Sequence, residues 1–70
     1  GTSMKYDLLS DREQQVLEKL AEGNTDKEIA LQLNLSTGTV NTYCKRIYGK
    51  LKVKNRTEAA KFYQELMIMR

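Results

Sequence analysis

The chain has 70 residues, of which 40% are hydrophobic and 30% charged, with one cysteine and no histidine. A chain of this length forms one small domain and has no room for an enzyme cleft. A single cysteine excludes an internal disulfide, and the lack of histidine removes the imidazole acid–base and the usual zinc ligands. No apolar run approaches the roughly 20 residues that span a bilayer, and no signal-peptide pattern is present. We therefore expect one cytoplasmic, non-enzymatic domain without metal or cofactor.

Charge is divided unequally between the two halves of the chain. Residues 1–35 carry four basic and seven acidic residues, whereas residues 36–70 carry eight basic and two acidic residues. Six of those eight cations lie between Lys45 and Arg56, and no acidic residue lies among them. Such a distribution orients an approach to a phosphate backbone. Charge alone is equally typical of a solvated face on an ordinary helical domain.

The first predicted helix follows a short N-terminal segment. Residues 1–4 look like the remnant of a cleaved tag, with Met4 as an alternative native start, so we take residues 5–70 as the domain. Ser10 and Glu13 match a capping box, which predicts a helix from about residue 10 to residue 22. Gly23 offers the left-handed conformation that ends it. Val16, Leu17 and Leu20 form its buried stripe, and both Leu8 and Leu9 are expected to pack onto the same core.

A second capping box, Thr25 to Glu28, predicts a short helix over residues 26–33. Asn34 then stands where a left-handed residue is needed, and Ser36 caps the next helix. A short helix, a three-residue turn and a longer helix form a helix-turn-helix arrangement.

The longer helix, residues 36–51, has two different faces. Val40, Cys44, Ile47 and Leu51 recur at the spacing of a helix packed on a core. The opposite face carries short polar residues, glycines and cations but no acidic residue. Its members are Gly38, Thr42, Lys45, Arg46 and Gly49, with Asn41, Thr39, Tyr43, Lys50 and Lys52 at the edges. Short polar side chains suit base edges in a major groove and cations suit phosphates, so this helix is predicted to read DNA.

The last predicted helix opens at Asn55 to Glu58, which repeats the cap-plus-Glu signature, and runs to about Met69. Its apolar residues are too many for one face. Ala59, Phe62, Tyr63 and Leu66 form a core stripe, whereas Ala60, Met67, Ile68 and Met69 extend beyond it. The surplus suggests a second copy of the chain as partner, with Ala60, Met67 and Ile68 at the dimer interface. Fraying of the helix end or contact with another part of a longer protein are the alternatives.

Several segments together resemble the LuxR-type helix-turn-helix domain, which also occurs in NarL/FixJ response regulators and in the spore regulator GerE. They are LSDREQQVL at 9–17, AEG at 21–23, DKEIA at 26–30, LSTGTV at 35–40, KL at 50–51 and NRTEAA at 55–60. Region 4 of sigma factors shares the opening segment and the helix-turn-helix. The segment VKNRTEAA at 53–60 is characteristic of the LuxR type, so promoter recognition like that of sigma region 4 is the second alternative. The resemblance implies an all-α, four-helix domain that binds duplex DNA in a bacterial transcription regulator. It also implies a homodimer on DNA through the last helix, and it leaves RNA polymerase open as a further partner.

The resemblance implies two sets of DNA contacts. Residues that match base-contacting positions are Asn41, Thr42 and Lys45. Residues suited to phosphate contact are Thr25, Lys27, Thr37, Thr39, Tyr43, Arg46, Lys50 and Arg56. Two departures from the family pattern matter, because the family commonly has a basic residue in place of Asn41 and a histidine in place of Tyr43. Asn41 could pair with adenine, which would change the preferred site, while Tyr43 can still donate to a phosphate.

For several other residues the sequence allows two interpretations. Cys44 is expected to be a buried, inert thiol rather than a redox sensor, and Tyr48 a core-edge aromatic. Lys52 and Lys54 are either solvated charges or phosphate contacts. The glycines of the DNA-reading helix indicate either close approach of the DNA backbone or tolerance of a weak position. The rival function is a helix-turn-helix that docks on a protein through its Met-rich last helix.

Overall fold

The computed structural model describes the backbone of residues 2–69 and the side chains of residues 5–69. All regular secondary structure within this range is helical, which confirms the all-α fold class. The helices are α1 (Thr2–Asp7), α2 (Asp11–Ala21), α3 (Asp26–Leu33), α4 (Thr37–Leu51) and α5 (Arg56–Met69). Gly1 and Arg70, which the predicted boundaries include, lie outside the described residues.

Local capping signals end and begin the helices where the sequence predicts. The Ser10 hydroxyl accepts from the amide of Glu13, and the Glu13 carboxylate accepts from the amide of Ser10, so the capping box is formed. Gly23 has a φ of +94° and Asn34 a φ of 58°, as expected for residues that follow a helix in the left-handed region. The signature at α5 differs by one residue, because Glu58 accepts from the amide of Lys54 instead of that of Asn55. The cap itself forms, since the Asn55 side chain accepts from the amide of Glu58.

Helix α1 precedes the four predicted helices and was not expected. Its first turn carries no acidic residue, and a single cation, Lys5, lies in its last turn. Contacts with other helices stabilise α1. The Gln14 side chain of α2 donates to the carbonyl oxygen of Tyr6 at 3.4 Å, and to that of Leu9, in the turn after α1, at 3.3 Å. The rings of Tyr6 and Tyr63 also meet, with centroids 6.2 Å apart. Whether residues 1–4 belong to a tag stays a prediction.

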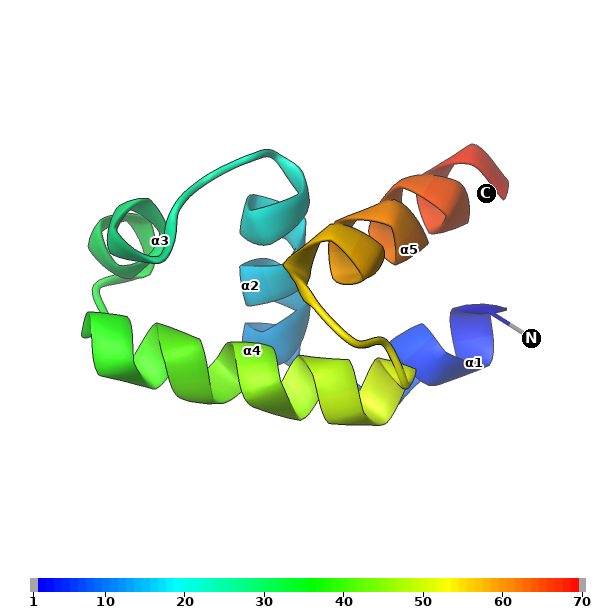
Figure 1. Cartoon of the computed structure of the whole chain (residues 1–70), viewed down its shortest axis with the longest axis horizontal. Coiled ribbons are helices and arrows are strands. Elements are labelled where there is room, and N and C mark those ends of the chain that lie inside the picture. The colour runs from blue at the N-terminus through cyan, green and yellow to red at the C-terminus, as the bar shows by residue number, and fades with distance from the viewer. Residues whose placement is uncertain (1, 70) are drawn as a thin grey trace.

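Helix α4 contacts each of the other four helices and runs along one side of the molecule (Figure 1). In Figure 1, α3 lies near its start and α1 near its end. The buried hydrophobic side chains come from all parts of the chain after α1, and they confirm the predicted stripes of α2 and α4. They are Leu9, Val16, Leu17, Leu20, Ile29, Ala30, Val40, Cys44, Ile47, Leu51, Ala59 and Leu66. This core presses one face of α4 inward and leaves its opposite face uncovered.

The expectation for Leu8 was wrong. Leu9 is buried, but Leu8 is 63% exposed, so only one of the two adjacent side chains reaches the core. Phe62 and Tyr63, expected in the core stripe of α5, are only half-buried. Every helix in the described part of the chain is too short or too polar to span a membrane.

Candidate nucleic-acid interface

The segment from Thr25 to Leu51 forms a helix-turn-helix. Thr25 caps α3 through a complete capping box with Glu28, whose carboxylate accepts from the Thr25 amide at 2.7 Å. Asn34, left-handed at the end of α3, turns the chain, and the amide of Leu35 donates to the carbonyl of Ala30 at 2.8 Å. Ser36 then caps α4 by accepting from the amide of Thr39. These local bonds fix the relative direction of α3 and α4.

The outer face of α4 holds the predicted base-contacting residues. Asn41, Thr42 and Lys45 are all exposed, whereas Val40 and Ile47 on the inner face have no exposed area. The structure therefore brings the three predicted residues together on one accessible surface.

Thr42 presents a defined hydrogen-bonding character on this surface. Its hydroxyl donates to the carbonyl of Gly38, four residues earlier, at 3.1 Å. A hydroxyl has one donor hydrogen and two acceptor lone pairs, so this bond uses the donor and leaves acceptor capacity. Thr42 can accordingly accept from a base amine, or place its methyl group against an apolar group such as the thymine methyl.

Four residues on one flank of α4 line a small polar pocket of about 180 Å³: Thr39, Thr42, Tyr43 and Arg46. Thr39, Tyr43 and Arg46 are predicted phosphate contacts, so the structure places three of the eight in one concavity. No carboxylate among the described side chains forms an ion pair with Arg46. Hydroxyl groups beside such a guanidinium suit an anion.

The cations near α4 fall into two classes. Lys45 and Arg46 are exposed and make no ion pair with any residue between 5 and 69. Lys50 and Arg56, two further predicted phosphate contacts, are each paired within the domain. The first class can neutralise an external phosphate in full, whereas the second would have to give up or share an internal partner.

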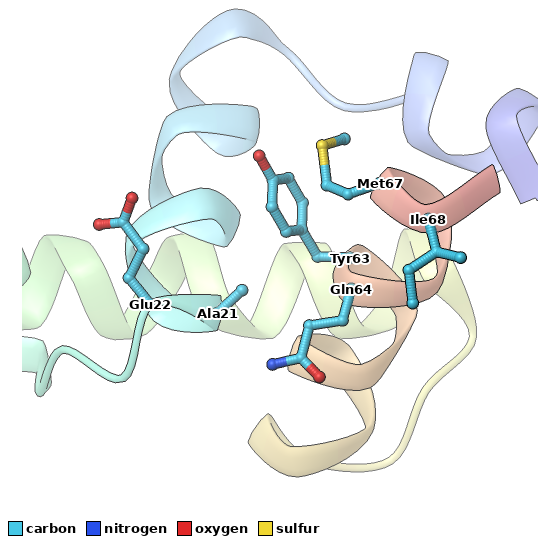
Figure 2. A pocket seen from close by; sticks show the side chains of 6 residues that line it. All are labelled: Ala21, Glu22, Tyr63, Gln64, Met67 and Ile68. Atoms are coloured by element: carbon cyan, nitrogen blue, oxygen red, sulfur yellow. The ribbon is translucent and has the colours of Figure 1, made fainter. Parts of the chain in front are cut away.

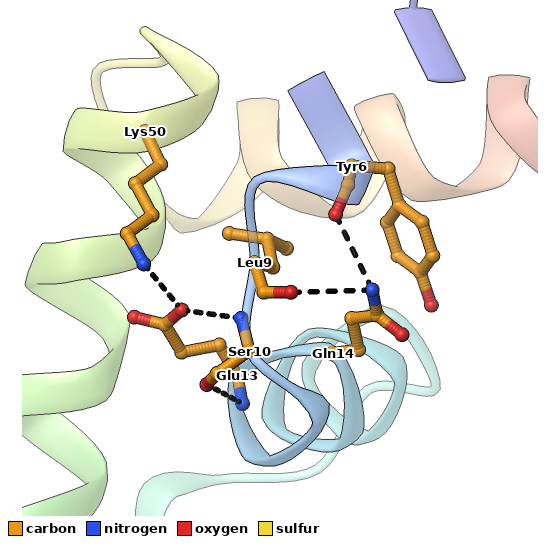
Figure 3. Close-up of polar contacts among 6 residues, drawn as sticks. All are labelled: Tyr6, Leu9, Ser10, Glu13, Gln14 and Lys50. Atoms are coloured by element: carbon orange, nitrogen blue, oxygen red, sulfur yellow. Dashed lines mark hydrogen bonds and ion pairs between the residues drawn. The ribbon is translucent and has the colours of Figure 1, made fainter. Parts of the chain in front are cut away.

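Lys50 is paired with a carboxylate that the sequence assigned only to a helix cap. Its ammonium donates to Glu13 Oε1 at 2.7 Å, and the same oxygen accepts from the Ser10 amide at 2.8 Å (Figure 3). Glu13 is only 3% exposed. Burial opposes its ionisation, but the hydrogen bonds from Lys50 and Ser10 and the charge of Lys50 outweigh burial, so the pKa of Glu13 lies below its ordinary value. The pair joins the start of α2 to the last turn of α4.

Arg56 crosses from the start of α5 to the start of α3. One terminal nitrogen donates to Asp26 Oδ1 and the other to the carbonyl oxygen of Asn24, both at 2.5 Å. Burial alone would lower the pKa of Arg56, but the bond and charge of Asp26 raise it above its ordinary value. The sequence did not reveal Asp26 or Asn24 as hydrogen-bond partners of Arg56, because they lie 30 and 32 positions away from it.

The remaining predicted phosphate contacts lie at helix starts. Thr25 and Lys27 are exposed at the start of α3, and Thr37 is exposed as the first residue of α4. Lys52 and Lys54, which the sequence left as either solvated charges or phosphate contacts, are exposed in the connection after α4. Lys52 adopts a left-handed conformation with φ 58° and ends α4, a role that the sequence did not reveal.

The predicted dimer residues differ in exposure. Met67 is 40% and Ile68 84% exposed, whereas Ala60 is half-buried and packs against the domain's own core. Met67 and Ile68 line an apolar pocket of about 410 Å³ between the end of α2 and α5, together with Ala21, Glu22, Tyr63 and Gln64 (Figure 2).

Cys44 is buried against the core of α4, as expected. Burial raises the pKa of its thiol, and Asp26 raises it further, so the thiolate is disfavoured. An inert packing role follows.

Comparison with known proteins gives a family match. Residues 7–63 match the family model described as "Bacterial regulatory proteins, luxR family". The chain is 53% identical over 51 residues to the transcriptional regulatory protein DesR of Bacillus subtilis, covering 73% of this chain and 26% of that protein. It is 42% identical over 69 residues to the DNA-binding transcriptional activator DevR/DosR of Mycobacterium tuberculosis, covering 94% of this chain and 32% of that protein. The chain thus spans between a quarter and a third of the length of these relatives.

Proposed function

This chain belongs to the luxR family of bacterial regulatory proteins, as a helix-turn-helix DNA-binding domain of a transcription regulator, and we propose that it binds duplex DNA with the outer face of α4 in the major groove. The observation that carries the proposal is the composition of that face: it is exposed, it holds two cations that no acid of residues 5–69 neutralises, and it bears short polar side chains. A face used only to dock a protein has no need to be free of acidic residues.

Base recognition is proposed for Asn41, Thr42 and Lys45. Lys45 suits the acceptors of guanine, and Asn41 suits the donor and acceptor of adenine. Thr42, with its donor used by Gly38, suits an amine of adenine or cytosine or the methyl group of thymine. Each good contact of this kind discriminates by roughly 1–3 kcal/mol.

Phosphate contacts are proposed for two groups of residues. The first is the pocket on α4, which Arg46 lines together with Thr39 and Tyr43. The second comprises Thr25 and Lys27 at the start of α3 and Thr37 at the start of α4. The first turn of α4 carries no acidic residue, so its helix dipole also favours an external anion. These contacts would provide most of the affinity and its dependence on salt.

A second copy of the chain is proposed as a partner on DNA. The exposed side chains of Met67 and Ile68 and the apolar pocket beside them support an interface on α5. Ala60 fits this interface less well, because the hydrophobic core of the same domain already covers part of the Ala60 side chain. RNA polymerase stays a prediction from the resemblance, and a cytoplasmic location follows from the proposed contact with chromosomal DNA.

The proposal is tested by fluorescence anisotropy of a labelled random-sequence duplex at several salt concentrations. The wild type is compared with a Lys45→Ala, Arg46→Ala double variant and with an Arg12→Ala, Lys61→Ala control. Both variants lose one lysine and one arginine, but Arg12 and Lys61 lie on α2 and α5.

We expect the affinity of the wild type to fall steeply with salt. The α4 variant should reduce the log–log slope by about one, because Arg46 is the proposed phosphate contact of the two. The control variant should keep a slope closer to that of the wild type. Absence of binding at low salt, or equal slopes for the two variants, would refute the groove assignment and favour a protein partner at α5.

A further inference from the structure

Arg56 makes a double hydrogen bond that joins the starts of two helices. Its guanidinium spans two acceptors, the Asp26 carboxylate and the Asn24 carbonyl, which flank Thr25 at the start of α3. Arginine presents its donors in a rigid planar fork, so two bonds fix both the position and the direction of what they hold. The first turn of α3 is thereby tied to the first turn of α5, although the two lie about 30 residues apart.

Asn24 extends this tie to α2. Its side-chain amide donates to the carbonyl of Lys19 at 2.8 Å, and its side-chain oxygen accepts from Gln32 at 3.1 Å. The turn before α3 is therefore bonded to α2, to α3 itself and, through Arg56, to α5. Few degrees of freedom remain for the residues that open α3.

Two proposed phosphate contacts, Thr25 and Lys27, sit on either side of Asp26. Their placement against a DNA backbone depends on where the first turn of α3 lies, and that is what Arg56 holds. Arg56 itself is poorly suited to meet a phosphate, because its charge is already neutralised by Asp26 and counterion release requires a cation that gains a new anion.

Resting on the proposed function, we infer that Arg56 is a positioning residue: it holds the first turn of α3, through Asp26 and the Asn24 carbonyl, where Thr25 and Lys27 meet the DNA backbone. This replaces the direct phosphate contact that the sequence implied for Arg56. The structural difference between the two roles is whether the bond to Asp26 is kept or released in the DNA complex.

Two substitutions of Asp26 separate these roles. Asp26→Asn and Asp26→Ala remove the same negative charge, but only asparagine keeps an oxygen that can accept from Arg56. The positioning role predicts that Asp26→Ala binds a random-sequence duplex about three- to tenfold more weakly than Asp26→Asn. A direct phosphate contact predicts that both variants free Arg56 and bind equally, and more tightly than the wild type.

If Arg56 acts by positioning α3, the difference in affinity between Asp26→Ala and Asp26→Asn must depend on the DNA contacts of α3. In a Lys27→Ala background these two variants should bind DNA with more nearly equal affinities. A difference caused by a general loss of folding would be the same in both backgrounds. Arg56→Lys serves as a second variant, since it keeps the charge but not the two-acceptor fork; positioning predicts weaker binding, and a simple phosphate contact predicts near wild-type binding.

Equal affinities of Asp26→Ala and Asp26→Asn, or a difference unchanged by Lys27→Ala, would overturn the inference while the wild type still binds DNA. Failure of the proposed function itself would look different, because the wild type would then show no salt-dependent binding at all. Thermal unfolding of each variant accompanies the titrations, so that a loss of folded protein is recognised as such.

Discussion

Gly38, exposed in the first turns of α4, provides a test of both stability and function. Glycine inside a helix costs about 0.5–1 kcal/mol relative to alanine. A Cβ added at Gly38 would meet only the Ser36 hydroxyl oxygen, at 3.9 Å, which is ordinary van der Waals contact. Gly38→Ala should therefore raise the free energy of unfolding by about 0.5–1 kcal/mol, which corresponds to roughly 2–8 °C in Tm for a domain of this size.

The chain provides two matched controls for this substitution. Gly49 lies on the same helix with nothing within 4 Å of an added Cβ, so Gly49→Ala should stabilise by a similar amount. Gly23 has a φ of +94°, so Gly23→Ala should destabilise by about 1 kcal/mol or more. The assay is thermal unfolding followed by circular dichroism. A Tm for Gly38→Ala below that of the wild type would refute the reasoning, since it would require a clash that the structure does not contain.

The same variants measure how closely DNA approaches α4. The first turns of a recognition helix contact base edges, so an added methyl group at Gly38 should weaken DNA binding although it stabilises the fold. Gly49, near the other end of α4, should show less effect. Equal affinities for the wild type and Gly38→Ala would mean that this glycine is only a tolerated weak position.

Three further predictions concern charged and buried side chains. The pKa of Glu13 in the folded domain lies below 4.5, the ordinary value of a glutamate, so its carboxylate stabilises the fold near neutral pH. This stabilisation is lost as the pH falls from 4.5 through the folded pKa, and denaturant titrations should show the loss. In Lys50→Met the pH-dependent loss of stability should be smaller. Lys45→Ala should relax specificity at one base pair by roughly 1–3 kcal/mol, whereas Arg46→Ala should weaken binding to all sequences and lower the salt slope by about one, as measured on a set of single-substitution duplexes. Cys44 should resist alkylation in the folded domain and react on unfolding; rapid labelling of the native protein would contradict its burial.

Signals that act over three or four residues made much of this fold predictable. The capping boxes at Ser10 and Thr25, and the left-handed residues Gly23 and Asn34, depend on neighbours in the sequence, and the structure has each of them. The same holds for the buried stripe of α4, which follows from helical spacing alone. The helix-turn-helix and its exposed outer face could therefore be predicted from local sequence patterns.

Contacts between distant residues were not predictable in this way. The partners of the Glu13–Lys50 pair lie 37 positions apart and those of the Arg56–Asp26 pair 30 apart, so no local pattern links them. Helix α1 is likewise held by contacts with α2, α4 and α5 instead of by a cap of its own. For this reason the sequence overstated how many of the predicted phosphate contacts are unpaired cations.

Contact between the outer face of α4 and DNA is tested most directly by amide chemical-shift mapping of the labelled domain titrated with a duplex. We expect the largest shifts on α4 between Thr37 and Arg46 and on the first turn of α3. Large shifts confined to α2 or to the end of α5, with the outer face of α4 unmoved, would contradict the proposed interface.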